Sequence, residues 1–234
     1  MLRNLIIFGF LNLTISLIGQ NTQMITNRVD SIKDFYYSET YNEYDFLNGK
    51  EYKPYYNPTT SSPLLESTMG VGTVYCKGVA YKKLTLLYDR NLDELIVMPN
   101  KFIAENIYVT LNKVKIDSFS IKYNDKLYHL IHHRSDDELP QGFYEIPYSG
   151  KNKLFIKHST NNLYNNGILT YYPKTERYLL KDDQYFQFKK KKDLLLIFSE
   201  NKKKIRKKLR SFHKPFKQLT NYQISQVLQF AESL

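Results

Sequence analysis

The sequence predicts a mainly β protein of the α+β class, in which an antiparallel meander is followed by a C-terminal α-helical hairpin. Turn signals containing Gly, Asn or Asp recur just ahead of strand-like segments that carry aromatic residues. Near the C-terminus the apolar residues change to the period of an amphipathic helix. Strands at this density are typical of a sheet that curls into a sandwich or a half-barrel, and the sequence leaves both open.

Residues 1–19 predict a secretory signal peptide. Arg3 precedes an apolar run from Leu5 to Gly19, and this run is shorter than the ~20 residues that a membrane-spanning helix needs. We expect cleavage close to Gly19; an uncleaved anchor is the alternative. The polar residues 20–45 have no sustained period and predict a poorly ordered lead-in.

Residues 46–192 predict the antiparallel β-meander domain. The turn signals lie at residues 48–52, 77–81, 124–128 and 182–185. The hairpins expected from them pair residues 81–88 with 93–98, 118–123 with 126–131, 143–147 with 153–158, and 177–181 with 184–189. Residues 59–70 predict a loop. Cys76 alternates with Val74, which favours a buried, unreactive thiol.

Residues 193–234 predict a basic helical hairpin packed on the sheet. Ser199 is expected to cap a helix with the apolar stripe Ile205, Leu209 and Phe212, and Asn221 to cap a second helix. Residues 193–198 fit either a strand or a short helical turn capped by Asp193. Neither helix is long enough to be stable alone, so the hairpin should pack on the sheet.

The net charge of +11 is concentrated in the C-terminal part of the chain. Residues 151–234 hold 19 Lys and Arg against 6 Asp and Glu, whereas residues 1–150 hold 15 against 17. This excess predicts a binding site for an anionic partner. The expected site residues are Lys189, Lys190, Lys191, Lys192, Lys202, Lys203, Lys204, Arg206, Lys207, Lys208 and Arg210. The alternative is a solvated helix face whose lysine stems cover apolar surface.

Motifs for other chemistry are weak. His129, His132 and His133 precede the acidic residues Asp136, Asp137 and Glu138, but strand geometry separates His129 from His133 by ~13 Å, so no metal site is predicted. The sequence has no G-x-S-x-G, H-E-x-x-H, P-loop or dinucleotide motif, and no cofactor is predicted. Tyrosines that alternate with aliphatic residues could line a ligand cavity, or could reflect β-propensity alone.

Several segments resemble one known group of proteins. Residues 46–52, 72–75, 86–89 and 190–195 are similar to those of uncharacterised exported β-rich proteins common in Bacteroidetes, and the similarity covers residues 45–234. The resemblance implies export, a β-rich fold and a short helix after the lysine run. It implies no activity and assigns no functional residue.

Together these features predict a non-enzymatic exported protein of the periplasm or outer cell surface. It would bind anionic lipid, lipopolysaccharide or an acidic envelope protein through its basic C-terminal patch. No nucleic acid partner is expected, because an exported protein does not meet chromosomal DNA. The alternatives are a carrier that holds a lipid-like ligand in a β half-barrel, and a hydrolase of envelope glycan on a β-scaffold.

Overall fold

The computed structural model describes residues 50–53, 61–98, 107–135 and 138–234. The predicted signal peptide and lead-in lie outside these residues, as do Asp136 and Asp137. All described residues belong to one compact unit, Asp45–Leu234. In this part of the chain, none of the helices has both the length and the apolar character needed to cross a membrane.

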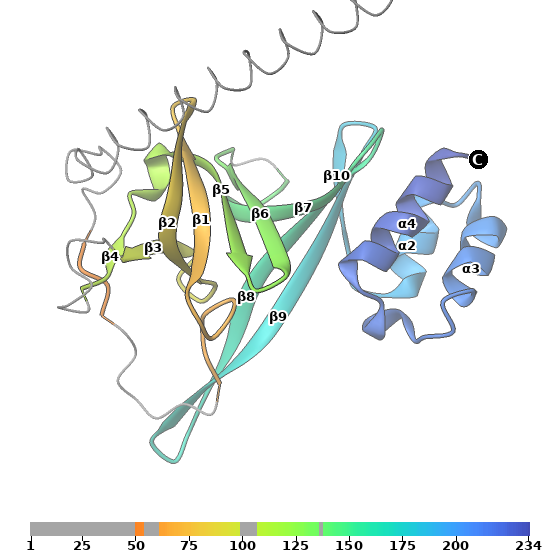
Figure 1. Ribbon diagram of the computed structural model, residues 1–234. Helices are drawn as coiled ribbons and strands as arrows, with labels where there is room; N and C mark the ends of the chain where they lie inside the picture. Colours follow the sequence, from red (N-terminus) through yellow and green to blue (C-terminus); the bar gives the residue numbers. More distant parts are fainter. Residues whose placement is uncertain (1–49, 54–60, 99–106, 136–137) are drawn as a thin grey trace, which may run out of the picture. The chain divides into compact units, whose positions relative to one another are not determined.

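In the described residues, ten antiparallel strands form a single sheet, which confirms the mainly β class (Figure 1). The strands are β1 (Gly70–Cys76), β2 (Val79–Asp89), β3 (Glu94–Met98), β4 (Val109–Thr110), β5 (Ile116–Tyr123), β6 (Lys126–His133), β7 (Gly142–Ser149), β8 (Lys153–Asn165), β9 (Ile168–Lys181) and β10 (Gln184–Phe188). Their order is β10-β9-β8-β7-β6-β5-β1-β2-β3-β4. The meander β5–β10 is therefore extended by β1–β4 through the pairing of β1 with β5, and these strands do not divide into the two sheets of a sandwich.

The four predicted hairpins are confirmed as β2–β3, β5–β6, β7–β8 and β9–β10. Other features lie outside the four expected hairpins. β4 was not expected, and β1 begins where a loop was expected to end, although the turn signal at 77–81 and the alternation of Val74 with Cys76 fit a strand there. The β8–β9 hairpin is also much longer than predicted, because β8 continues to Asn165 and β9 starts at Ile168.

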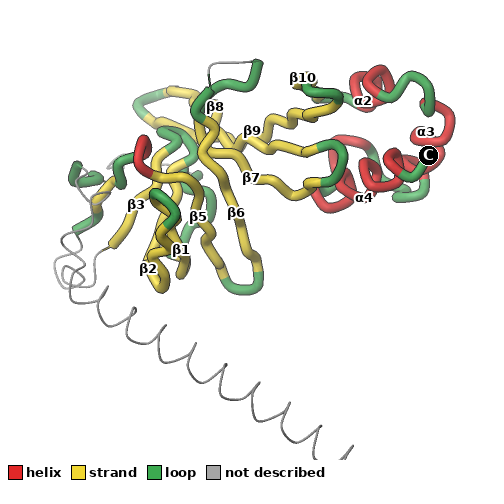
Figure 2. Tube along the Cα trace, turned by 90° about the horizontal axis from the view of Figure 1, so that it is seen from above, coloured by secondary structure: helices red, strands yellow, loops and turns green. Residues whose placement is uncertain are grey.

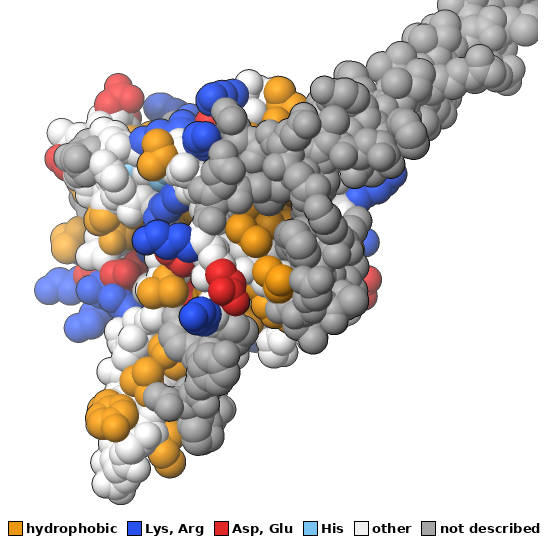
Figure 3. Space-filling view, turned by 90° about the vertical axis from the view of Figure 1, so that its left-hand side faces the viewer, with side chains coloured by type: hydrophobic (Ala, Val, Ile, Leu, Met, Phe, Trp, Pro, Cys, Tyr) orange, Lys and Arg blue, Asp and Glu red, His pale blue; other side chains and the backbone are white. Residues whose placement is uncertain are grey.

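The long β8–β9 hairpin closes through a tight turn of two residues. Asn166 and Gly167 have φ angles of 47° and 77°, the left-handed pair typical of a two-residue type I′ turn. Near the tip, Leu163, Tyr164, Ile168 and Tyr172 are exposed. Hydrophobic side chains gather at the lower end of Figure 3, where this hairpin ends.

Three α-helices follow the sheet, which confirms the expected C-terminal helices; the first covers the segment whose structure the sequence left open. They are α2 (Lys191–Ile197), α3 (Lys202–Arg210) and α4 (Asn221–Glu232), with short 3-10 turns at η4 (Lys113–Lys115) and η5 (Phe216–Gln218). The ambiguous segment 193–198 is thus helical. Asp193 is the third residue of α2, not its N-cap, and its carboxylate accepts the backbone N–H groups of Lys189 and Lys190 at 2.9 and 2.8 Å.

The predicted helix starts were displaced by one or two residues. α3 has Asn201 as its N-cap, not Ser199, because a tight turn in which the N–H of Asn201 bonds the carbonyl of Phe198 delays the helix. The N-cap of α4 is Thr220, not Asn221, and its hydroxyl accepts the N–H of Gln223 at 3.2 Å.

The helices pack on one face of β8–β10 (Figure 2). The interface consists of thirteen buried side chains: Leu154, Ile156, Leu179, Phe188, Leu194, Leu195, Phe198, Ile205, Leu209, Leu219, Ile224, Val227 and Leu228. On the other face of β7–β9, Phe155 packs with Tyr144 and Tyr178. Because side chains alternate along a strand, these two cores bury consecutive residues of β8.

Asp93 links the two halves of the sheet. Its carboxylate accepts the hydroxyl of Tyr88 at 2.5 Å, the ammonium of Lys157 at 2.6 Å and the ammonium of Lys113. It also accepts the backbone N–H of Phe143 at 3.3 Å. The β2–β3 turn is thereby joined to η4, β7 and β8.

Candidate functional site

The predicted basic residues come together on α2, α3 and the link from β10. Lys189 and Lys190 precede α2, Lys191 and Lys192 form its first turn, and the other seven lie on α3. α3 buries Ile205 and Leu209 against the core, so most of its cations lie on the remaining faces. We call these eleven residues the basic surface.

Within the described residues, no member of the basic surface forms an ion pair. The ion pairs found there all join groups of the sheet and its turns. Nine of the eleven cations are exposed, and Lys191 and Lys208 are half-buried. The ammonium of Lys208 lies 5.6 and 5.8 Å from the ring centres of Phe212 and Phe230, so this lysine also packs on the core.

The helices hold almost all of the net charge. Residues 189–234 contain 13 Lys and Arg against 3 Asp and Glu, a net +10 of the +11 for the chain. Of the three carboxylates, Asp193 accepts the backbone N–H groups of Lys189 and Lys190, and Glu232 is held by Asn152. The basic surface is therefore left with little compensating charge.

α2 and α3 also form an open cavity of about 380 Å³, which we call the basic groove. It is lined by Lys191, Lys192, Leu195, Leu196, Lys202 and Arg206. Leu195 is buried, whereas Leu196 is 58% exposed. The volume lies within the range of small-molecule sites.

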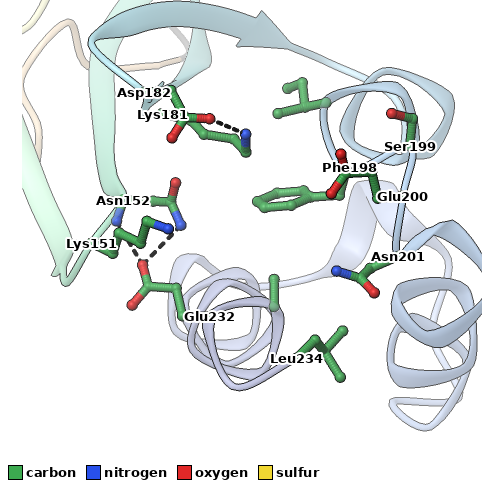
Figure 4. Close-up of a pocket in the computed structure, with 12 residues that line it drawn as sticks. Lys151, Asn152, Lys181, Asp182, Phe198, Ser199, Glu200, Asn201, Glu232 and Leu234 are labelled. Atoms are coloured by element: carbon green, nitrogen blue, oxygen red, sulfur yellow. Dashed lines mark hydrogen bonds and ion pairs between the residues drawn. The ribbon is translucent and has the colours of Figure 1, made fainter.

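A second cavity of about 400 Å³, the junction pocket, lies where the sheet turns meet the helices (Figure 4). Lys151 and Asn152 come from the β7–β8 turn, and Lys181 and Asp182 from the β9–β10 turn. The link between α2 and α3 contributes Ser199, Glu200 and Asn201, and the end of α4 contributes Glu232 and Leu234.

Two of the carboxylates that line the junction pocket, Glu232 and Asp182, are held by neighbours. Glu232 accepts the backbone N–H and side-chain amide of Asn152 at 2.6 and 2.9 Å and the hydroxyl of Tyr148 at 2.8 Å. Burial alone would raise the pKa of Glu232, but these hydrogen bonds lower it overall. The hydrogen bond from Lys181 likewise lowers the pKa of Asp182. These two carboxyls thus lack the raised pKa of a glycosidase general acid.

The histidines of β6 point to different faces. Nδ1 of His132 lies 3.1 Å from the carbonyl oxygen of Ile116, and burial lowers the pKa of this histidine. His133 instead packs against the rings of Tyr144 and Tyr185. Across the part of the chain that the structure describes, no three His, Cys, Asp or Glu side chains converge as metal ligands.

Several of the strand tyrosines belong to the core. Tyr88, Tyr144 and Tyr171 are almost fully buried, and the hydroxyl of Tyr128 donates to Glu66 at 2.5 Å. The space between β8–β10 and the helices is occupied by the thirteen-residue core described above.

Sequence reasoning missed Glu232 and Asn152 because they are 80 residues apart and carry no motif. It also missed the exposed Leu196, because residues 194–197 are all apolar and their sequence does not show which of them faces the core.

Comparison of the chain with protein-family models, curated proteins and solved structures finds no significant match in any of the three. The functional interpretation therefore rests on the geometry and charge of the chain itself.

Proposed function

We propose that this chain is an exported, non-enzymatic protein that binds anionic lipid at the periplasmic or outer cell envelope through its basic surface. The observation that carries the proposal is the set of eleven cations, none of which forms an ion pair within the described residues. The signal-peptide pattern of residues 1–19 and the resemblance to exported proteins support the location.

Like charges that lack counter-charges repel one another, and an anionic membrane relieves this repulsion. Each Lys or Arg near such a surface contributes about 1 kcal/mol of attraction, which decays within a Debye length. Several side chains acting together are therefore enough for stable attachment.

The composition of the basic surface favours lipid over an acidic protein. Nine of its residues are lysines, and only Arg206 and Arg210 carry guanidinium groups. Lysine acts as a compact point charge suited to a diffuse anionic layer, whereas paired recognition of carboxylates favours the planar fork of arginine.

The helices present this charge on a rigid support. The thirteen-residue core holds α2–α4 on the sheet, and Glu232 fixes the end of α4 to Asn152. Binding then requires little ordering of the backbone, which reduces its entropic cost.

The test is sedimentation of the purified protein with vesicles across a salt series. Vesicles of phosphatidylglycerol and phosphatidylcholine are compared with vesicles of phosphatidylcholine alone. We expect binding to the anionic vesicles only, with affinity falling as salt rises. The variant K202Q/K203Q/K207Q should bind at least about 100-fold more weakly, at about 1 kcal/mol per lysine.

The matched control is K82Q/K122Q/K153Q, which removes the same charge from exposed lysines of the sheet. It should retain most of the binding. Equal loss in both variants would show a response to net charge alone and would contradict a localised surface. Equal binding to neutral vesicles would favour the lipid carrier instead.

A further inference from the structure

The basic groove combines positive charge with an apolar surface. Its four cations come from two helices: Lys191 and Lys192 from α2, Lys202 and Arg206 from α3. The other lining residues, Leu195 and Leu196, are neighbouring apolar residues at the end of α2. The groove therefore offers a strongly positive rim beside an apolar strip.

No carboxylate of the described residues lines this groove. Asp193 lies on α2, yet its side chain is directed to the backbone of Lys189 and Lys190. Glu200 lines the junction pocket. Four positive charges thus share one opening whose lining contains no carboxylate, which favours a ligand that carries more than one negative charge.

Leu196 gives the groove its apolar character. Its side chain is 58% exposed, although Leu194 and Leu195 beside it are buried. A single exposed leucine is ordinary on a protein surface, but this one shares a cavity of about 380 Å³ with four cations. A ligand with hydrocarbon directly beside its anionic group would contact both the cations and the leucine side chain.

We propose that the basic groove binds the phosphate headgroup of a single membrane lipid, with the first methylenes of an acyl chain lying on Leu196. The inference rests on the proposed function and deepens it. The basic surface would bring the protein to the membrane, and the groove would hold one lipid there.

Two soluble probes separate the charged and apolar contributions. Dihexanoyl phosphatidic acid, below its micellar concentration, carries a phosphate and short chains; glycerol 3-phosphate carries the phosphate alone. Titration calorimetry of the purified protein should show about tenfold tighter binding of the lipid, as expected for one to two buried methylenes. Leu196→Gln should reduce lipid affinity to that of glycerol 3-phosphate and leave glycerol 3-phosphate binding unchanged.

The matched control is Leu127→Gln, which alters another exposed leucine, on β6, and should change neither affinity. K192Q/R206Q should weaken both probes, whereas K82Q/K153Q, with the same change in charge, should weaken neither. Since all six substituted positions are exposed, circular dichroism should show native folding in each variant.

Equal affinity of the unaltered protein for the two probes would overturn the groove proposal, as would an unchanged lipid affinity in Leu196→Gln. Either result is compatible with retained binding to anionic vesicles, so the proposed function would survive it. Tighter binding of hexaglutamate than of dihexanoyl phosphatidic acid would overturn the lipid assignment in favour of an acidic protein.

Discussion

One oxygen of Glu232, Oε1, accepts both the backbone N–H and the side-chain amide of Asn152, which lies 80 residues earlier in the chain. The last turn of α4 is thereby fixed to the β7–β8 turn. Gly150 permits this approach, since a Cβ atom there would collide with the Glu232 carboxylate and the Tyr148 hydroxyl. The position of the helices on the sheet thus depends on one carboxylate as well as on apolar packing.

Glu232→Gln should lower the free energy of unfolding by about 1 kcal/mol at pH 7, because a partly exposed, charge-assisted set of hydrogen bonds is lost. The pKa of Glu232 is lower in the folded protein than in the unfolded chain. Its stabilisation is therefore present above the unfolded pKa and is lost as pH falls through the folded pKa. Urea denaturation at pH 7 and at pH 3 should show the difference from the unaltered protein shrinking at low pH.

Glu200→Gln is the control, because Glu200 lines the same pocket but is exposed. It should change the free energy of unfolding by less than about 0.5 kcal/mol. A Glu232→Gln effect that stays constant from pH 7 to pH 3 would contradict a role for the ionised carboxylate.

Asp93→Asn should be the more damaging change. It removes the carboxylate partner of the half-buried ammonium of Lys157, so the cost should exceed the about 1 kcal/mol of an exposed ion pair and approach the about 3–5 kcal/mol of a fully buried one. Burial already lowers the pKa of Lys157, and Asp93 acts against that effect. Urea denaturation of Asp93→Asn, compared with the unaltered protein, measures the loss.

Asp117→Asn provides the comparison on the surface. The Asp117–Arg134 pair has side chains 41% and 47% exposed, so its loss should cost less than about 1 kcal/mol. The double variant D93N/K157M should recover part of the stability lost in Asp93→Asn, because it removes the unpaired charge. Equal costs for the two single aspartate variants would disprove the role of Asp93 as a link between sheet halves.

The hairpins could be predicted from sequence because their turns are local. Asp182 and Asp183, for example, both adopt positive φ in the turn that was identified. β1 was not among the expected hairpins in spite of the turn signal at 77–81, because its glycines lower strand propensity. A Cβ at Gly72 would collide with the carbonyl of Ser120, so the need for glycine is visible only once β1 lies beside β5.

The candidate site could be predicted in part for the same reason. The lysine runs are local features, and their position on helices follows from the apolar stripe that contains Ile205 and Leu209. The groove itself depends on how α2 packs against the core, which decides that Leu195 is buried and Leu196 exposed. The rotation of α2 about its own axis is set by tertiary packing, and no local pattern encodes it.

Stability should fall as pH rises above about 10. Burial raises the pKa of Tyr88, Tyr123 and Tyr128, and burial together with the hydrogen bond to Glu232 raises the pKa of Tyr148 to about 12. A raised folded pKa gives stabilisation that is complete below the unfolded pKa and is lost as pH rises through the folded value. Urea denaturation at pH 9 and pH 11 should show the decrease.

Tyr128→Phe isolates one of these groups from lysines that titrate in the same range. Its unfolding free energy should fall less steeply between pH 10 and pH 11 than that of the unaltered protein, by up to about 1.4 kcal/mol per pH unit. An unchanged slope would mean that the Tyr128 hydroxyl does not resist ionisation in the folded state.

Cys76 should report the opening of the central sheet. Its thiol is 3% exposed, and β1 is bonded on both sides, to β2 and to β5. Labelling by a thiol reagent should therefore require unfolding of the sheet and be far slower than for free cysteine. Asp93→Asn should accelerate labelling about tenfold for each 1.4 kcal/mol of stability lost, if the same unfolding controls both. Asp93→Asn could have a lower unfolding free energy and still be labelled as slowly as the unaltered protein. That result would show that β1 opens independently of the cooperative unit that Asp93 holds together.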